Sequence, residues 1–267
     1  MKVRVSLVQM SGFWEKEKTI EKMIEKVDEA CKSNLDFVVL PEMWNCPYGT
    51  KYFREYGEVC TLEDSVTLKA MSDIAKKNKI YLFGGSIAEL DGDKVYNTCF
   101  VFDREGNIIA KHRKHHLFDV DIKGGMKFKE SDVLSAGDRL TTVDTEFGKV
   151  GVMICFDLRF GRDFYELNKN GDIGMFVIPA AFNMTTGPRH WELLLRARAV
   201  DNQAYILACA PAQDENAPYK AFGHSTIINP WGDIIEMAEF DEIVINREID
   251  LDIINESRTQ IPVNTIM

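Results

Sequence analysis

The sequence lacks an apolar run of the roughly 18 residues that a helix needs to cross a bilayer, so we expect no membrane-spanning segment and no membrane partner. Residues 1–10 alternate between apolar and polar side chains as a strand does. They show neither the apolar stretch nor the cleavage site of a signal peptide. The simplest interpretation is a cytoplasmic protein.

Positive charge is also scarce, because 32 Lys and Arg residues stand against 42 Asp and Glu residues, which gives a net charge of −10. Nucleic-acid binding depends on neutralising phosphates, so we expect no nucleic-acid partner. The glycine-rich phosphate loops GxGxxG and GxxxxGK[ST] are missing as well, which disfavours a nucleotide-binding protein. An anionic small molecule would need a specific cation in its own pocket.

The six cysteines form no CxxC pair, and in a cytoplasmic chain this favours free thiols over disulfides or a zinc site. His112, His115 and His116 raise a metal site as an alternative. Adjacent histidines in a strand would point to opposite faces, however, and no carboxylate-rich motif lies nearby in the sequence. We therefore expect neither a metal nor a cofactor.

Apolar periodicity indicates an α/β chain in which short buried strands alternate with amphipathic helices. Strands are predicted at 3–7, 36–40, 80–88, 97–102, 107–111, 150–155, 173–179, 204–210, 226–228 and 233–236, and helices at 20–31, 63–78, 161–170 and 190–203. Both halves share this order of elements, which fits either an internal duplication or a chance likeness between glycine-containing hairpins. A duplication would give two mixed sheets packed face to face with helices outside, a four-layer α-β-β-α sandwich. No linker divides the chain, so residues 1–267 are expected to form a single domain.

Cys155 is the first candidate for chemistry, because it ends the strand Val150-Gly-Val-Met-Ile-Cys155 and precedes a turn into a helix. Open α/β sheets place their sites at the carboxyl ends of strands. A helix N-terminus there would favour the thiolate over the thiol. The alternative is a cysteine that is buried only for packing.

Two further segments carry candidate polar groups. Glu42 follows the buried strand at 36–40, where a carboxylate is costly unless it is paired, although it could also be an ordinary helix-start glutamate. Residues 111–119 are rich in Lys, His and Arg, and such a run is often a solvated basic face.

Three blocks, Leu40-Pro-Glu42, Lys114-His-His-Leu-Phe-Asp119 and Gly151-Val-Met-Ile-Cys155-Phe-Asp157, together resemble the signatures of the nitrilase, or carbon–nitrogen hydrolase, superfamily. They occur in that family's order and at compatible spacing, and the resemblance extends over nearly the whole chain. It implies the α-β-β-α fold, a Glu-Lys-Cys triad, a small-molecule amide substrate and frequent homodimers.

The resemblance assigns a role to each triad residue. The Cys155 thiolate would attack an amide carbonyl and form a thioester, with Glu42 as general base and acid. Lys114 and the backbone N–H of Phe156 would hold the tetrahedral oxyanion. Glu130 resembles the family's second glutamate, which orients the lysine and the substrate; otherwise it is a loop acid beside Lys129.

Substrate-binding candidates surround this triad in the sequence. Arg159 lies four residues beyond Cys155, and its planar guanidinium suits bidentate capture of a carboxylate. The resemblance implies the same role, with Thr185 nearby. Tyr48 follows Glu42 by six residues and would cap the pocket, unless it is an exposed loop tyrosine.

Within the superfamily the chain most resembles the ω-amidases, which hydrolyse 2-oxoglutaramate and 2-oxosuccinamate. Supporting stretches begin at Phe118, Phe128, Ala181, His190, Arg198 and Gly223. Phe156 stands where ω-amidases often have Tyr, and Gly124-Gly-Met also departs from their pattern; both differences leave substrate preference open. The alternatives are an N-carbamoyl amino acid or aliphatic monoamide hydrolase, and a catalytically silent binding protein.

Overall fold

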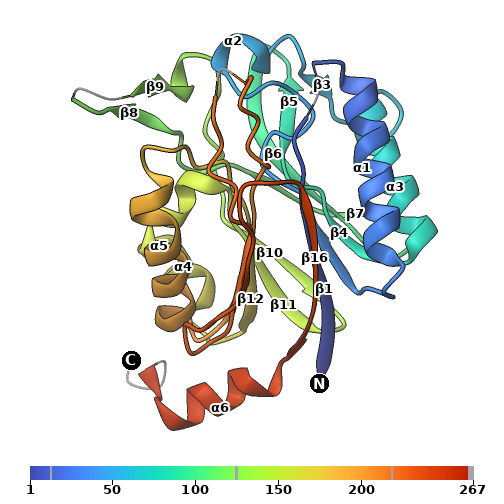
Figure 1. Ribbon diagram of the computed structural model, residues 1–267. Helices are drawn as coiled ribbons and strands as arrows, with labels where there is room; N and C mark the ends of the chain where they lie inside the picture. The colour runs from blue at the N-terminus through green and yellow to red at the C-terminus, as the bar shows by residue number, and fades with distance from the viewer. Residues whose placement is uncertain (13, 124–125, 218, 264–267) are drawn as a thin grey trace.

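A computed structural model describes residues 1–12, 14–123, 126–217 and 219–263. Two mixed sheets face each other in the middle of the molecule, and helices cover their outer sides (Figure 1). The four-layer α-β-β-α class predicted from the sequence is confirmed. The segment Gly124-Gly-Met, which differs from the ω-amidase pattern, begins with two residues that lie outside the described ranges.

The first sheet contains β1 (Lys2–Gln9), β2 (Phe37–Val39), β3 (Glu58–Val59), β4 (Tyr81–Phe83), β5 (Ile87–Asp91), β6 (Lys94–Phe102), β7 (Ile108–Arg113) and β16 (Ile243–Asp250). Within the described residues the strands pair in the order β16-β1-β2-β4-β6-β5-β3, and β7 also pairs with β6. Helices α1 (Lys16–Cys31) and α3 (Val66–Asn78) cover its outer face (Figure 1). The short helix α2 spans Thr50–Phe53.

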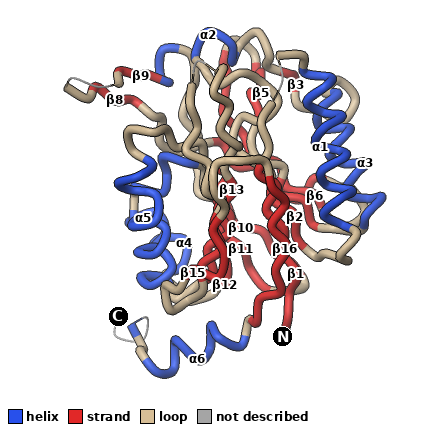
Figure 2. Tube along the Cα trace, viewed as in Figure 1, coloured by secondary structure: helices blue, strands red, loops and turns tan. Residues whose placement is uncertain are grey.

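The second sheet contains β10 (Thr141–Thr145), β11 (Gly148–Val152), β12 (Ile173–Pro179), β13 (Tyr205–Cys209), β14 (Thr226–Ile228) and β15 (Ile234–Met237), paired in that order. Helices α4 (Gly161–Asn168) and α5 (Gly187–Asn202) lie on its outer side (Figure 2). A separate hairpin of β8 (Asp119–Asp121) and β9 (Lys127–Lys129) projects from the body, and α6 (Asp252–Gln260) lies near the N-terminus of the chain (Figure 1). The described residues also form two 3-10 helices, η1 (Glu130–Asp132) and η2 (Cys155–Arg159).

The same order of pairing occurs in both sheets. β1, β2 and β4 are parallel neighbours and β6 follows them antiparallel. β11, β12 and β13 are likewise parallel, followed by the antiparallel β14. The repeated order of elements in the sequence therefore corresponds to a repeated topology, and an internal duplication remains a hypothesis about its origin.

β2 and Leu40 after it are apolar because this segment is buried on both faces. Phe37 and Val39 belong to the core between the two sheets. Val38 and Leu40 belong to the core under α1 and α3. This double burial brings the chain that follows the strand, starting at Pro41, into the interior.

The strand predicted at 80–88 is wrong as a single element, because β4 ends at Phe83 and β5 begins at Ile87. Gly85 between them has a φ of +63°, and a Cβ there would lie 2.1 Å from the carbonyl oxygen of Pro41. The break lets Ser86 hold the backbone on both sides of Glu42. Its N–H donates to the Pro41 oxygen at 3.1 Å, and its hydroxyl accepts from the Met43 N–H at 3.0 Å.

Candidate active site

Glu42, Lys114 and Cys155 come together from three segments that are far apart in the sequence. Glu42 follows β2, Lys114 follows β7 and Cys155 follows β11. All three side chains are buried, with Glu42 and Lys114 each 1% exposed and Cys155 5% exposed. Burial of charged groups is tolerated only when they are paired and hydrogen-bonded, so the contacts of these groups decide what the site can do.

The Lys114 ammonium lies between two buried carboxylates. Its Nζ donates to Glu42 Oε1 at 2.9 Å and lies 2.9 Å from Glu130 Oε2. Burial alone would lower the pKa of Lys114, but the charges of Glu130 and Glu42 raise it well above its usual value. The lysine is therefore a fixed cation, as an oxyanion-binding group must be.

The Glu42 carboxylate is held on both oxygens. Oε1 also accepts from Asn97 Nδ2 at 2.8 Å, and Oε2 accepts from the backbone N–H of Ala181 at 2.7 Å. Asn97 lies in β6 of the first sheet, and Ala181 follows β12 of the second. The orientation of the carboxylate therefore depends on how the two sheets pack.

Glu130 is fully buried at the start of η1, so it is not the exposed loop acid of the alternative interpretation. Its Oε1 accepts from the hydroxyl of Tyr48 at 3.0 Å, and its Oε2 accepts from the backbone N–H of Phe118 at 2.8 Å. Burial raises the pKa of Glu130 although the Lys114 charge opposes this. Tyr48, which was expected to cap the pocket, is half-buried and contacts Glu130 in the structure.

Cys155 has a backbone φ of +46°, an uncommon conformation for a residue other than glycine. It forms the turn from β11, which ends at Val152, into η2. Burial, the Glu42 charge and a hydrogen bond to Glu42 raise the pKa of the Cys155 thiol well above its usual value, although the Lys114 charge opposes this. The expectation that a helix N-terminus would favour the thiolate is therefore wrong, because η2 is a short 3-10 helix and burial outweighs any effect of its N-terminus.

Cys155 and Arg159 line the same small pocket. Its other lining residues are Phe118, Phe156, Ala181, Phe182, Thr186 and Tyr219. Thr185, the sequence candidate, is half-buried beside this pocket, and its neighbour Thr186 provides the lining. A larger pocket borders Glu42 and Tyr48 and shares Tyr219 with the small one. The smaller pocket is the candidate reaction pocket, because Cys155 lines it.

Arg159 has no carboxylate within 4.0 Å among the residues that the structure describes. Its guanidinium lies over the rings of Phe156, at 5.5 Å, and Phe182, at 5.1 Å, and its Nη1 is 3.1 Å from His190 Nδ1. Burial lowers the pKa of Arg159. A half-buried cation that finds no counter-ion in the described part of the chain, and that lies near a nucleophile, is suited to an anionic group of a ligand.

Several of these contacts could not be identified from the sequence. Asn97 and Tyr219 stand in segments without a recognisable polar motif. His190 and the Ala181 segment were noted only through family resemblance. Phe156 contributes its ring below Arg159, and its N–H lies in the first turn of η2, where N–H groups lack helical partners.

The structure contradicts the expectation that His115 and His116 lie in a strand and point to opposite faces. Residues 114–118 are not in a strand, and both imidazoles turn toward the carboxylate of Asp163 in α4. His112 lies in β7, fully buried, with its Nε2 3.3 Å from Asp157 Oδ2. The three histidines thus split into one buried residue and one half-buried pair.

This fold and this buried Glu-Lys-Cys arrangement define a hydrolase of carbon–nitrogen bonds, and residues 4–259 match the carbon–nitrogen hydrolase family. The chain belongs to that family. It is 48% identical to Omega-amidase NIT2-B of Xenopus laevis over 98% of this chain and 94% of the relative, and 45% identical to Omega-amidase NIT2 of Mus musculus over 97% and 93%. The structure of Saccharomyces cerevisiae Nit3, a member of branch 10 of the nitrilase superfamily, superposes with a TM-score of 0.91 at 41% identity, covering 98% and 95%.

Within the described residues, no helix is long and apolar enough to span a membrane.

Proposed function

We propose that this chain is a cysteine-dependent ω-amidase, which hydrolyses the terminal amide of a small dicarboxylic acid, such as 2-oxoglutaramate or 2-oxosuccinamate, to the acid and ammonia. One observation carries this proposal. Cys155 and Arg159 line one small pocket, and the guanidinium has no carboxylate partner among the described residues, so a short substrate can present its amide to the sulfur and its carboxylate to Arg159. The names of the relatives point to the same substrate class.

Acylation begins when Glu42 takes the thiol proton as the Cys155 sulfur attacks the carbonyl carbon. The raised pKa of Cys155 means that the resting group is a thiol, so this transfer accompanies the attack. The developing oxyanion is held by the Lys114 ammonium and the Phe156 N–H. Glu42 then gives its proton to the departing nitrogen, the C–N bond breaks, and ammonia leaves a thioester on Cys155.

Deacylation uses the same groups. Glu42 accepts a proton from water as the water oxygen attacks the thioester carbonyl, and the C–S bond then breaks. The proton returns to sulfur, which releases the carboxylic acid and regenerates the thiol. Glu130 keeps Lys114 oriented through both steps, because it pairs with the ammonium as Glu42 does and is itself held by Tyr48 and Phe118.

The substrate carboxylate forms a bidentate pair with Arg159 in this scheme. Phe156 and Phe182 limit water around the guanidinium, which strengthens the pairing. Thr186 lines the pocket, and Thr185 beside it supports the loop through its N–H bond to Asn183 Oδ1 at 2.9 Å. Tyr48 acts on the site through Glu130, to which its hydroxyl donates a hydrogen bond.

We also propose a single domain over residues 1–267 that forms a homodimer, takes no nucleic-acid partner and works in the cytoplasm without a cofactor. All six cysteines are free thiols in the structure, which suits a reducing compartment.

Ammonia release from a panel of substrates tests the function. Purified enzyme is assayed with ω-amides of dicarboxylic acids, uncharged monoamides, N-carbamoyl amino acids and nitriles. We expect the highest kcat/KM for the ω-amides. Preference for an uncharged monoamide or a carbamoyl compound would instead identify another amidase of the family, and no turnover by a folded protein would identify a silent relative.

A further inference from the structure

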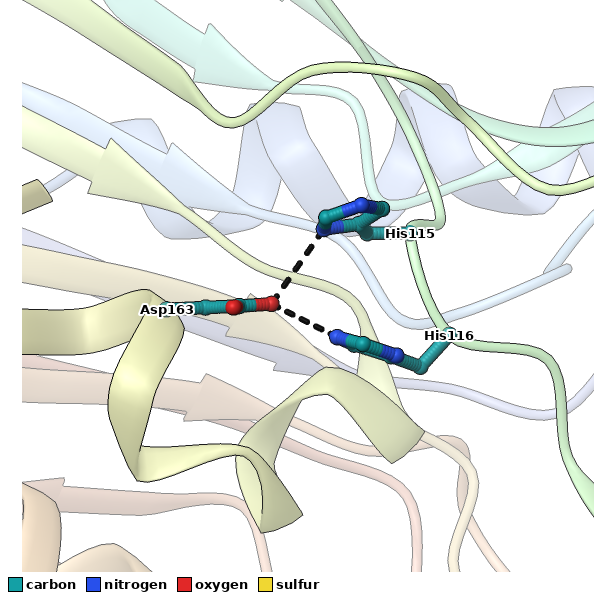
Figure 3. A group of neighbouring side chains, drawn as sticks. All are labelled: His115, His116 and Asp163. Carbon is teal, nitrogen blue, oxygen red and sulfur yellow. Dashed lines mark hydrogen bonds and ion pairs between the residues drawn. The ribbon is translucent and has the colours of Figure 1, made fainter. Parts of the chain in front are cut away.

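His115, His116 and Asp163 form a half-buried cluster outside the reaction pocket (Figure 3). The carboxylate of Asp163 lies between the two imidazoles, with Oδ2 at 3.2 Å from His115 Nδ1 and 2.6 Å from His116 Nε2. One ligand atom from each residue lies within 4.8 Å of the other two. Within the described chain this is the one group of three or more His, Cys, Asp or Glu residues with such spacing.

The cluster has the composition of an open zinc site. Two imidazole nitrogens and one carboxylate oxygen, with water as a fourth ligand, are a common donor set for zinc. Metal–ligand distances near 2.0–2.1 Å put neighbouring tetrahedral ligands about 3.3 Å apart. The Asp163–His115 distance of 3.2 Å already matches, and the Asp163–His116 distance must lengthen by a fraction of an ångström.

The surrounding structure holds the loop of both histidines and the His116 ring in place before any ion binds. The buried Asp157 accepts from the backbone N–H of His116 at 2.7 Å and of His115 at 3.4 Å. The His116 ring is stacked on Phe160, with centroids 3.4 Å apart and planes 9° from parallel. Side-chain exposures of 31%, 26% and 15% for His115, His116 and Asp163 leave solvent access for the water ligand.

We propose that His115 Nδ1, His116 Nε2 and the Asp163 carboxylate bind one divalent transition-metal ion of the zinc type, at a site separate from the reaction pocket. The adjacent Lys114 directs its ammonium away, to Glu42 and Glu130. A bound ion ties the loop that carries Lys114 to α4, which follows η2 and Cys155. It therefore stabilises the folded chain and takes no part in bond cleavage.

Direct metal binding tests this site. Full-length protein without an added histidine tag is stripped with chelator and dialysed against zinc, and cobalt(II) absorption then reports the donor atoms. We expect one zinc per chain, a rise in Tm, and cobalt bands without the near-ultraviolet band of a cysteine thiolate ligand. His116→Ala and Asp163→Asn should each weaken zinc binding by at least about tenfold. Removing a residue that only supports a metal ligand already costs about tenfold, and removing a ligand itself should cost no less.

His224→Asn is the matched control, because His224 faces a single carboxylate, Glu239, at 3.9 Å, and asparagine tolerates its φ of +62°. This variant should keep full binding. Circular dichroism confirms that each variant is folded, and His115→Ala, at a more exposed position, replaces any variant that is not. A thiolate band, binding that survives Asp163→Asn and His115→Ala together, or no zinc retained by the wild-type chain would each overturn the proposal.

Discussion

At the level of single residues, the Cys155 side chain is almost wholly removed from water, its thiol is hydrogen-bonded to Glu42, and the charges of Lys114 and Glu130 also act on it. Within the described residues, none of the other five thiols is hydrogen-bonded to a carboxylate. Burial raises the pKa of Cys31 and of Cys60 to about 12, and the carboxylates whose charges add to this effect form no hydrogen bond with either thiol. The environment of the sulfur therefore distinguishes the proposed nucleophile from the remaining thiols.

Replacement of Cys155 by alanine should reduce kcat by roughly four to six orders of magnitude, because the covalent step is lost. The fold should survive, as judged by circular dichroism, since only one sulfur atom is removed. Cys31→Ser, on the half-buried side of α1, is the control and should keep its activity. Mass spectrometry should trap an acyl group on Cys155 with slow substrates, and full activity in Cys155→Ala would end the proposal.

Arg159→Ala should lower kcat/KM for a dicarboxylic ω-amide by tens- to thousands-fold, since losing a buried charge pair costs about 2–5 kcal/mol. An uncharged amide makes no such contact and should be affected far less. Arg159→Lys should restore little, because an ammonium cannot reproduce the planar pairing. Equal losses for both substrates would show that Arg159 supports the fold or the triad.

Replacing His190 tests the same carboxylate-binding role of Arg159, with a smaller expected effect. Its Nδ1 lies 3.1 Å from Arg159 Nη1, so a neutral His190 can accept a hydrogen bond from the guanidinium. Burial and the charge of Arg159 lower the pKa of His190, which favours that neutral form. His190→Ala should raise KM for the ω-amide by about tenfold, one hydrogen bond to a charged group, with little change for the uncharged amide.

At the scale of secondary-structure elements, a buried carboxylate joins three of them. Glu58 in β3 accepts from Lys16 Nζ of α1 at 2.9 Å, and from Ser65 and Thr67 at the start of α3, each at 2.5 Å. The Thr67 N–H also donates to it, at 3.1 Å. Glu58 therefore satisfies N-terminal groups of α3 and fastens that helix to α1.

Glu58→Gln should lower the free energy of unfolding by about 1.5–3 kcal/mol, measured by urea denaturation, because a buried charged acceptor is lost. Glu15→Gln, which removes an exposed ion pair with Lys18 at 3.0 Å, should change the midpoint very little.

The effect of Glu58 should also depend on pH. Burial alone would raise the pKa of Glu58, but Lys16, Ser65 and Thr67 lower it overall. A lowered folded-state pKa means that the stabilisation is complete above the unfolded-state value, about 4.3, and is lost as pH falls through the folded-state value. The difference in free energy of unfolding between wild type and Glu58→Gln should therefore become smaller below about pH 4. A difference that does not change with pH would contradict this account.

At the scale of the whole molecule, the end of the chain completes the sheet that its beginning starts. β16 pairs antiparallel with β1 along its whole length, from Ile243–Gln9 to Asp250–Lys2. Ile245 and Ile249 point into the core between the sheets, and Ile243 on the same strand is 43% exposed. The two halves therefore depend on each other for folding.

Ile245→Ala should destabilise the molecule by about 2–5 kcal/mol, because it opens a cavity between the sheets. Ile243→Ala removes the same atoms from an exposed position and should cost about 0.5 kcal/mol or less. Thermal unfolding of both variants measures the difference. Equal destabilisation would mean that β16 contributes through pairing alone and not through the shared core.

Turnover by the whole enzyme should not require a metal, even though we propose a zinc-type site at His115, His116 and Asp163. Exhaustive chelation should remove any bound ion and leave kcat for the ω-amide unchanged within error. Loss of activity that added zinc restores would contradict the proposed Glu42–Lys114–Cys155 chemistry.

Local sequence was enough to predict the layered α/β class and the family. Apolar periodicity shows burial along each strand, and the three motif blocks sit directly after strands, where local sequence is informative. It could not determine the break between β4 and β5, because only the close approach of the Pro41 carbonyl makes Gly85 necessary. Nor could it determine the pairing of β16 with β1, which joins residues about 240 positions apart.

Tertiary structure alone decided the electrostatics of the site. Cys155 was expected to favour a thiolate from its place in the chain, yet packing buries it and raises its pKa. Glu42 is held by Asn97 and Ala181 from different sheets, and no local pattern reports such a contact. His115 and His116 share Asp163 because their loop leaves the strand. A pKa and a ligand geometry are set by neighbours in space, and sequence spacing does not supply those neighbours.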